Sequence, residues 1–352
     1  MSGAERFVKE TIERLRGKYR FFIITARLRS DLPTEEDFEG YKVIRVGRGD
    51  KWDKLRYIWL APRKAKKFNP QLIHAVMESY AGLALWLAKY AVMGTKRILT
   101  LQSGDLDRKI WSKILVLWGG IHKSPDFVTA ISRFLADRAY RLGAKKVEII
   151  PNGVDLGEIN DVLASRGGNI KHRIVILARL SWEKDHKNLV AAMPRILSEY
   201  PDTEMVFVGD GPEKHNLEFR IQNLGLKDKI KFLGNLPHKT ALEELAKADV
   251  FVCPSLAEGL GIVFIEAQAL GVPVIGTSVG GIPDVITDNE TGLLIKPGSS
   301  GAIAEAILKI FRMSPEEKNK MIERAMASVA EKFNWDNIAA KIDKIYNALT
   351  CE

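Results

Sequence analysis

A chain of 352 residues is about twice the usual domain length, which predicts two domains and excludes a peptide, a fibre or a disulfide-stapled miniprotein. Apolar residues at 46% and charged residues at 28% lie near the averages of globular proteins. The formal charge of +9 belongs to one half only: residues 1–150 contain 30 Lys and Arg against 16 Asp and Glu, and residues 151–352 contain 23 against 28. This change of sign indicates two units with different partners.

The two cysteines, Cys253 and Cys351, make neither a disulfide framework nor a set of metal ligands, and they indicate a reducing compartment. The N-terminus has no apolar signal segment. The longest apolar stretch, Ala81 to Ala88, is far shorter than the roughly 18 residues of a membrane span. We therefore expect a cytoplasmic protein, peripheral at the cytoplasmic face of a membrane at most.

Short β-branched runs alternate with longer amphipathic runs, which is typical of parallel βαβ units in an α/β fold. After a helix at Phe7–Leu15, the first half has predicted strands at Tyr19–Thr25, Lys42–Val46, Leu72–Ala75, Arg97–Leu101, Phe127–Ile131 and Val147–Ile150. The second half has predicted strands at Arg173–Ala178, Glu204–Val208, Ile230–Leu233, Val250–Cys253, Val272–Gly276 and Gly292–Ile295. Helices fill the intervals.

The two series of strands meet at Pro151-Asn152-Gly153, where a proline followed by Asn-Gly ends a strand in a tight turn. We place the domain boundary there, with an N-terminal domain over residues 1–151 and a C-terminal domain over 152–335. A long helical tail, Ser314 to Thr350, has no strand of its own.

The most informative stretch follows the strand at Val250–Cys253 and opens a helix. Its glycine-rich loop comprises Gly259, Leu260, Gly261 and Ile262. Glycines let the backbone approach a ligand and a helix N-terminus favours negative charge, so the loop suits a diphosphate. Glu266, one turn inside the helix, could accept hydrogen bonds from a ribose diol, and Glu258 would face another part of the ligand. The plainer interpretation is that both glutamates are solvated and the glycines only turn the chain.

A second stretch, Ala178 to Leu189, also follows a strand. Arg179 and Lys184 lie five residues apart across a strand-to-helix turn, where open α/β sheets bind ligands. Two fixed cations would neutralise the charge that builds on a departing diphosphate; the alternative is a pair of surface cations. Weaker signals are Gly209, Gly234 and Asn235, where glycine ends a strand and the backbone could approach a base or sugar.

These motifs occur in one ordered set: I-P-N-G-V-D, A-R-L-x-x-E-K-D, V-G-D-G-P, F-L-G, E-G-L-G-I-V-F-I-E-A, G-G-I-P-D and N-E-T-G-L-L-I-K-P-G. The set resembles the nucleotide-sugar-dependent retaining glycosyltransferases of family 4, which have the GT-B fold of two facing Rossmann-like domains. The resemblance is close over residues 150–350 and looser before them.

The resemblance implies a role for each motif residue. Arg179 and Lys184 would bind the donor diphosphate, Glu258 the donor sugar hydroxyls with the loop Gly259–Ile262 behind it, and Glu266 the ribose. The terminal helix, residues 336–352, would cross back to the N-terminal domain. No cofactor and no essential metal are expected; the nucleoside-diphosphate sugar is a substrate.

The first half departs from the family pattern at its start. Family members begin with a strand and a Gly-Gly-x-Glu loop, whereas this sequence begins inside that loop, so that Gly3 matches a cleft position and the first strand is missing. That strand is central in the family's sheet, so its absence would leave a gap between neighbours that lack backbone partners. We hypothesise that the sequence begins at an internal methionine of a longer protein.

A second departure is Gln102, which stands where many members have the histidine of a Thr-x-His motif facing the donor sugar. Glutamine cannot act as a general base near neutral pH. A retaining transfer needs mainly leaving-group stabilisation and positioning, so the change is compatible with activity but leaves the identity of the sugar open. His74, at the end of a strand, matches a family histidine that we interpret as structural.

The basic charge gathers in two segments that also contain aromatic residues. Lys51–Phe68 has seven cations, one acid and four aromatics, and Asp105–Trp118 mixes cations with Trp111 and Trp118. Such helices suit an anionic membrane interface or an acceptor bearing phosphates; alternatively, the aromatics pack in the core and the cations are solvated. No nucleic-acid partner is expected, because no recognised binding module accompanies the charge.

The sequence therefore predicts a glycosyltransferase that moves a sugar from a nucleoside-diphosphate sugar to a hydroxyl acceptor, which would be a glycan, a lipid-linked molecule or a small molecule, with retention of configuration. The alternatives are a non-catalytic or truncated nucleotide-sugar binding protein and a GT-B sugar-nucleotide epimerase.

Overall fold

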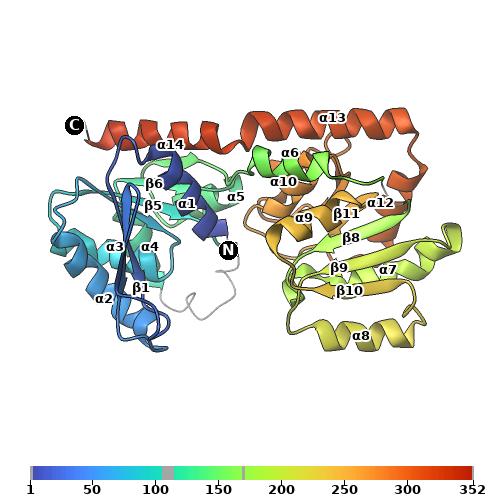
Figure 1. Ribbon diagram of the computed structural model, residues 1–352, viewed down its shortest axis with the longest axis horizontal. Coiled ribbons are helices and arrows are strands. Elements are labelled where there is room, and N and C mark those ends of the chain that lie inside the picture. The colour runs from blue at the N-terminus through green and yellow to red at the C-terminus, as the bar shows by residue number, and fades with distance from the viewer. Residues whose placement is uncertain (1–2, 105–114, 169–170, 351–352) are drawn as a thin grey trace. The chain divides into compact units, whose positions relative to one another are not determined.

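The computed structural model describes residues 3–104, 115–168 and 171–350. The chain divides into two compact units, one of Met1–Asn152 with Trp335–Glu352 and one of Gly153–Asn334. Both units are α/β layers whose sheets are mainly parallel, as the alternation of runs in the sequence predicts (Figure 1).

The first unit has six described helices: α1 (Gly3–Leu15), α2 (Asp53–Lys66), α3 (Tyr80–Ala91), α4 (Leu115–Lys123), α5 (Arg133–Arg141) and α14 (Trp335–Thr350). Its described strands are β1 (Phe21–Ala26), β2 (Glu35–Phe38), β3 (Tyr41–Val46), β4 (Leu72–Val76), β5 (Lys96–Leu101), β6 (Phe127–Ala130) and β7 (Val147–Ile149). The six strands predicted here are confirmed to within two residues. The strand β2, which pairs antiparallel with β3, is not among those that the sequence predicts.

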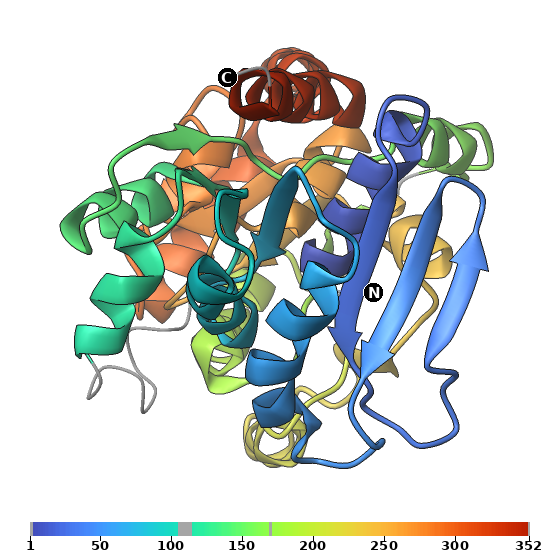
Figure 2. The same cartoon turned by 90° about the vertical axis from the view of Figure 1, so that its left-hand side faces the viewer.

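The strands of this unit form two sheets, with the orders β1-β3-β2 and β4-β5-β6-β7. Within the described residues, β1 pairs only with β3, and β4 pairs only with β5. Every residue of β1 and β4 is partly exposed, whereas the last four residues of β5 are buried. Figure 2 turns this unit toward the viewer, with the strands nearest the N-terminus in blue. The missing central strand stays a hypothesis; among the described residues the strands divide into these two sheets.

The helix α1 begins earlier than predicted. The family resemblance implies a loop through Arg6, but the backbone is already helical at Gly3. Ala4, Glu5 and Arg6 include strong helix formers, and an acidic residue in the first turn is favourable for the helix dipole, so the loop prediction was wrong from Gly3 onward.

The core of the first unit joins its two ends. Phe7 of α1 and Trp335 of α14 are 1% exposed and pack edge to face with ring centroids 6.3 Å apart. His74 lies in the same core: its Nδ1 contacts the Tyr346 hydroxyl at 2.7 Å and its Nε2 contacts Thr100 Oγ1 at 2.6 Å. Burial lowers the pKa of His74 to about 4. These contacts agree with the structural role predicted for this histidine.

The second unit contains the helices α6 (Leu156–Ala164), α7 (His186–Glu199), α8 (Lys214–Asn223), α9 (His238–Ala246), α10 (Ile262–Ala269), α11 (Ile282–Val285), α12 (Ser300–Arg312) and α13 (Pro315–Lys332), and the 3-10 turn η3 (Trp182–Lys184). Its strands are β8 (Arg173–Leu177), β9 (Glu204–Val208), β10 (Ile230–Gly234), β11 (Val250–Cys253), β12 (Val274–Thr277) and β13 (Leu293–Ile295). All six match predicted strands to within two residues.

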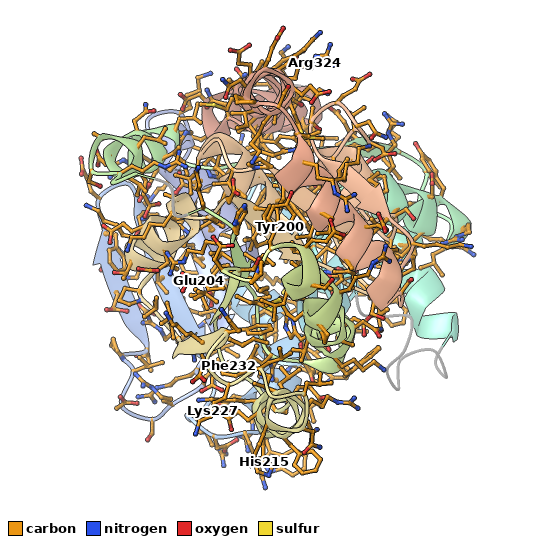
Figure 3. The ribbon with its side chains drawn as sticks, turned by 90° about the vertical axis from the view of Figure 1, so that its right-hand side faces the viewer. Tyr200, Glu204, His215, Lys227, Phe232 and Arg324 are labelled. Atoms are coloured by element: carbon orange, nitrogen blue, oxygen red, sulfur yellow. The ribbon has the colours of Figure 1, made fainter. Side chains whose placement is uncertain are left out.

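The six strands form one parallel sheet in the order β10-β9-β8-β11-β12-β13. Buried apolar side chains of its strands and helices form one continuous core, which includes Ile176, Phe207 and Val252. Figure 3 shows this unit with Phe232 of β10 and His215 of α8 labelled. Because the strands are parallel, the loops after β8, β9, β10 and β11 all leave the same edge of the sheet.

The predicted helical tail consists of two helices. Ser314 caps α13 in a reciprocal capping box with Glu317, and α13 ends at Lys332. The carbonyl of Phe333 then accepts a hydrogen bond from the Val154 N–H at 2.9 Å. The helix that follows, α14, forms an ion pair with Arg14 of α1 through Asp336. It forms another through Asp343 with Lys18, which lies in the turn after α1. In the described part of the chain, no helix is long and apolar enough to cross a membrane.

Candidate active site

The loops at the carboxyl edge of the second sheet contact one another through glycines. Gly209 directly follows β9 and has a φ of +134°; a Cβ there would lie 2.1 Å from the Ala178 carbonyl oxygen of the neighbouring loop. The N–H of Gly209 also donates to the carbonyl of Gly234 at 2.8 Å, which joins the ends of β9 and β10. Only glycine fits this approach, so Gly209 fixes the spacing of three adjacent loops.

A cation and a carboxylate from two of these loops lie in direct contact. Lys184 closes η3 after β8, and Glu258 lies in the loop between β11 and α10. The distance between Lys184 Nζ and Glu258 Oε2 is 2.5 Å, and the two side chains are 18% and 20% exposed. The loops are also tied by the Leu256 N–H, which donates to the Glu183 carbonyl at 2.7 Å. The sequence motifs place Lys184 and Glu258 in one site, and the structure brings them together.

Arg179 lies in the loop that follows β8, and its side chain is exposed. Its carbonyl oxygen lies 3.1 Å from Nε2 of the buried His186. Burial lowers the pKa of His186 to about 4, so the ring is neutral at pH 7 and its Nε2–H donates to that carbonyl. Among the described residues, no carboxylate forms an ion pair with the Arg179 guanidinium.

The glycine-rich loop leads directly into α10, with Gly261 as the N-cap residue in a left-handed conformation. Leu260 is 2% exposed, whereas Ile262 is partly exposed. A second glycine turn packs against the backbone of this loop. Gly280 has a φ of +56°, a Cβ there would lie 1.8 Å from the Glu258 carbonyl oxygen, and the next residue donates its N–H to that oxygen at 3.2 Å. The backbone of Glu258 is therefore held in place independently of its side chain.

Glu266 lies in α10 and is 4% exposed. Its Oε1 lies 2.9 Å from Nε2 of His238, the first residue of α9. The other ring nitrogen of His238, Nδ1, lies 3.0 Å from Glu158 Oε1 in the first turn of α6. Glu266 is thus a buried carboxylate at the loop edge of the sheet, held by a histidine from a neighbouring helix.

Glu183, between the two cationic residues of its loop, shows how their charge affects nearby acids. Partial burial acts to raise the pKa of Glu183, but the hydrogen bond from Ser181 and the charges of Lys184 and Arg179 lower it below the ordinary value. The region after β8 therefore favours negative charge.

The remaining predicted site residues lie apart from this cluster or in the other unit. Asn235 is exposed directly after β10, and Gly259 lies buried in the loop after Glu258. In the first unit, Gly3 begins α1. The amide groups of Gln102 and Asn152 exchange two hydrogen bonds, of 3.1 and 2.8 Å.

Sequence reasoning missed two charged features. His238 stands alone after Leu236-Pro237 in the sequence, and only its place at the start of a helix at the carboxyl edge could have pointed to it. The second feature is the fully buried Glu78 of the first unit, which pairs with the buried Arg138 and accepts the Gln102 N–H at 3.4 Å. Burial raises the pKa of Glu78, while the charge of Arg138 opposes the shift.

The first of the two basic segments has large apolar side chains at the surface. In Lys51–Phe68, Trp52, Leu55 and Trp59 are 55%, 46% and 59% exposed. Phe68 instead stacks on Phe22 with ring centroids 4.3 Å apart, and both residues are partly exposed. Residues 105–114, most of the second segment, lie outside the described residues.

Two family models match the chain. "Glycosyl transferases group 1" matches residues 168–328, and "Glycosyltransferase Family 4" matches residues 1–158. The second match covers the half in which the sequence motifs are weaker.

Curated proteins and solved structures resemble the chain over most of its length. It is 32% identical over 293 residues to N-acetyl-alpha-D-glucosaminyl L-malate synthase of Bacillus anthracis, covering 80% of this chain and 76% of that protein. It is 30% identical to the GDP-mannose-dependent alpha-(1-6)-phosphatidylinositol monomannoside mannosyltransferase of Mycobacterium tuberculosis, covering 74% and 72%. The structure of sucrose-phosphate synthase from Thermosynechococcus elongatus matches 99% of this chain and 94% of its own, with a TM-score of 0.86 and 24% identity. The fold is GT-B, built from two Rossmann-like units.

Proposed function

The chain belongs to family 4 of the glycosyltransferases and is a glycosyltransferase; from this premise we propose that it moves a sugar from a nucleoside-diphosphate sugar to a hydroxyl acceptor with retention of configuration. The observation that supports the proposal best is the contact between Lys184 and Glu258 at the carboxyl edge of the second sheet. A cation beside a carboxylate is what the proposal needs, with Lys184 for a diphosphate and Glu258 for sugar hydroxyls.

We assign each side of the donor to a different loop. Arg179 and Lys184 neutralise the diphosphate, and the N–H groups at the start of α10 add the positive end of a helix dipole. Glu258 accepts hydrogen bonds from the donor sugar. Glu266, one turn further along α10, accepts hydrogen bonds from the ribose.

The reaction breaks the bond between the anomeric carbon and the diphosphate oxygen, and the bonding electrons leave with the diphosphate. The acceptor hydroxyl forms the new bond on the same face of the sugar, and its proton passes to the departing phosphate oxygen. The protein stabilises the charge on the leaving group and holds the reactants in position, so the route needs no general base from the side chains. The glutamine at position 102 is compatible with this chemistry.

The experiment first measures slow release of nucleoside diphosphate from a panel of donors that includes GDP-mannose and UDP-N-acetylglucosamine. It then measures transfer of the sugar to hydroxyl acceptors. We expect one donor to be turned over. Lys184→Ala and Glu258→Ala should abolish turnover, whereas Lys187→Ala, which removes an exposed cation of α7, should leave it unchanged. The anomeric configuration of the product, read by NMR, tests retention.

Three outcomes contradict the proposal. An inverted product rules out the same-face route. Donor binding without any turnover would favour the non-catalytic alternative, and turnover that survives both alanine substitutions would place the site elsewhere.

A second proposal concerns the acceptor side: we propose that α2 of the first unit contacts an anionic membrane surface. Trp52, Leu55 and Trp59 follow the i, i+3, i+7 spacing of one helix face, and all three are exposed. Exposed cations flank this face: Lys51, Lys54 and Arg63. A basic helix with exposed tryptophans suits the boundary between lipid headgroups and acyl chains.

The test is co-sedimentation with vesicles of anionic phospholipid and with neutral vesicles. We expect salt-sensitive binding to the anionic vesicles only, lost in Trp52→Ser/Trp59→Ser. The matched control is Phe219→Ser, which removes an aromatic that is 62% exposed on α8 of the second unit. Absence of binding at low salt, or binding that survives the double substitution, would refute the membrane proposal.

A further inference from the structure

His238 is held on both sides by carboxylates from two other helices. Its Nδ1 lies 3.0 Å from Glu158 of α6, and its Nε2 lies 2.9 Å from Glu266 of α10. The three elements are separated in the sequence but meet at one point beside the loop edge of the sheet. The side chain of Glu266 is 6% exposed, that of Glu158 is 28% exposed and that of His238 is 44% exposed.

The chemistry of the contact fixes the orientation of the ring. An imidazole can donate a hydrogen bond from both nitrogens only when both are protonated, so the doubly protonated ring is the form that satisfies both carboxylates. In that form His238 places one positive charge between two negative ones. Because both nitrogens are engaged, rotation of the ring would break both contacts.

The same contact orients Glu266. A carboxylate has about four lone-pair sites, so the hydrogen bond with His238 restrains the group without exhausting its capacity to accept others. A vicinal diol needs two acceptors in a fixed plane. A hydrogen bond from a residue behind a ligand-binding group commonly holds that group in position.

We propose that His238 is a positioning residue, which holds the Glu266 carboxylate in the orientation that accepts both hydroxyls of the donor ribose. Glu158 contributes by holding the far side of the ring. The inference rests on the proposed function, in which Glu266 binds the ribose. It adds that the preference of this protein for a ribonucleotide depends on a residue that does not itself touch the nucleotide.

The test compares ribonucleoside diphosphates with their 2′,3′-dideoxy forms by calorimetry. The probes are UDP, GDP, ADP and CDP, and the base that binds most tightly is used for the comparison. The wild-type protein should bind the ribonucleotide at least tenfold more tightly than the dideoxy form. His238→Ala should weaken ribonucleotide binding about fivefold to tenfold and leave dideoxynucleotide binding unchanged.

Two further variants separate positioning from a merely structural role. His238→Gln retains an N–H donor near the position of Nε2 and should restore most of the discrimination. Glu266→Gln should lose the discrimination, and the double variant His238→Ala/Glu266→Gln should lose no more than the single one, because both act on the same contact. In turnover, His238→Ala should raise KM for the donor with little change in kcat, since the ribose contact is equal in the ground and transition states.

The matched control is His215→Ala, which removes an exposed histidine of α8 in the same unit (Figure 3) and should change neither affinity. If Glu266→Gln removes the discrimination but His238→Ala does not, the positioning role is overturned and the ribose assignment stands. If His238→Ala weakens both nucleotides equally, its role is structural and the inference fails. If Glu266→Gln leaves the discrimination intact, or no diphosphate binds, the ribose assignment itself fails.

Discussion

Lys184 Nζ lies 2.5 Å from Glu258 Oε2, and each residue comes from a different loop of the second unit. The two loops are 74 residues apart in the sequence and are joined by a backbone hydrogen bond as well. Both side chains are about one-fifth exposed, so the pair is partly solvated. We therefore expect the pair to serve ligand binding and to contribute little to the stability of the fold.

This leads to a prediction about the pair itself. In a double-mutant cycle with Lys184→Met and Glu258→Gln, the coupling energy in urea unfolding should be only about 1 kcal/mol, because exposed and partly exposed ion pairs contribute little. Each single variant should nevertheless lower kcat by about 10²–10³, which is typical for loss of a group that stabilises transition-state charge. A coupling energy of several kcal/mol with near-normal turnover would show that the pair is structural.

A glycine prediction tests how closely the loops pack. Gly280→Ala should lower the free energy of unfolding by about 3 kcal/mol or more and reduce turnover, because a Cβ at this position would overlap the Glu258 carbonyl. Gly298→Ala is the matched control: Gly298 also has a positive φ, +76°, but a Cβ there would meet no atom within 4 Å. The control should lose about 1 kcal/mol and retain activity. Equal effects of the two substitutions would mean that backbone strain, not the close approach, is decisive.

The buried His74 should make the free energy of unfolding sensitive to acid. The pKa of His74 is about 4 in the folded chain against an ordinary value of 6.5, so the unfolded chain binds this proton first. The free energy of unfolding should therefore fall as pH decreases from about 6.5 toward 4, by about 1.4 kcal/mol per pH unit for this histidine. Urea unfolding at pH 7, 6 and 5 measures the slope.

His74→Gln should reduce that slope, whereas His215→Gln, at an exposed position, should not. His186 has a similarly lowered pKa and shifts stability in the same direction, so part of the slope should remain. An unchanged slope in His74→Gln would contradict the prediction.

The stability of the protein should depend on the buried carboxylate of Asp53. Asp53 is fully buried and accepts hydrogen bonds from the Gly49 N–H at 2.6 Å, the Asp50 N–H at 3.3 Å and Arg56 at 2.8 Å. Asp53→Asn should lower the free energy of unfolding by about 2–3 kcal/mol, because the charged acceptor of all three donors is lost. Asp50→Asn removes the exposed partner of the same arginine and should cost less than about 1 kcal/mol. Similar losses in the two variants would argue against this account.

Sequence patterns predicted most strands because their runs of buried apolar residues mark the positions clearly. The strand they missed, β2, has no such pattern, since three of its four residues are acidic. It is held by charge instead: Lys42 of β3 lies 2.9 Å from Glu35, and Lys64 of α2 lies 2.7 Å from the other oxygen of Glu35. Periodicity of apolar residues cannot detect a strand that pairs through cross-strand charges.

The candidate site was predictable to the extent that short motifs follow strands. Lys184, Glu258 and Glu266 each lie one loop or one helical turn past a buried strand, so the edge of the sheet that they share could be inferred. The motifs could not predict which other side chains contact these residues. His238 reaches Glu266 only because α9 and α10 pack together, and this is a property of the tertiary structure.

The division of the first unit's strands into two sheets has a consequence for solvent exchange of its backbone amides. β1 and β4 each have a described neighbour on one side only, whereas β5 is paired with both β4 and β6. Successive amides of a strand point alternately to its two sides, so half of those in β1 and β4 have no ladder partner. Native-state hydrogen exchange should therefore alternate between fast and slow along β1 and β4, with a period of two residues, and stay uniformly slow along the middle of β5.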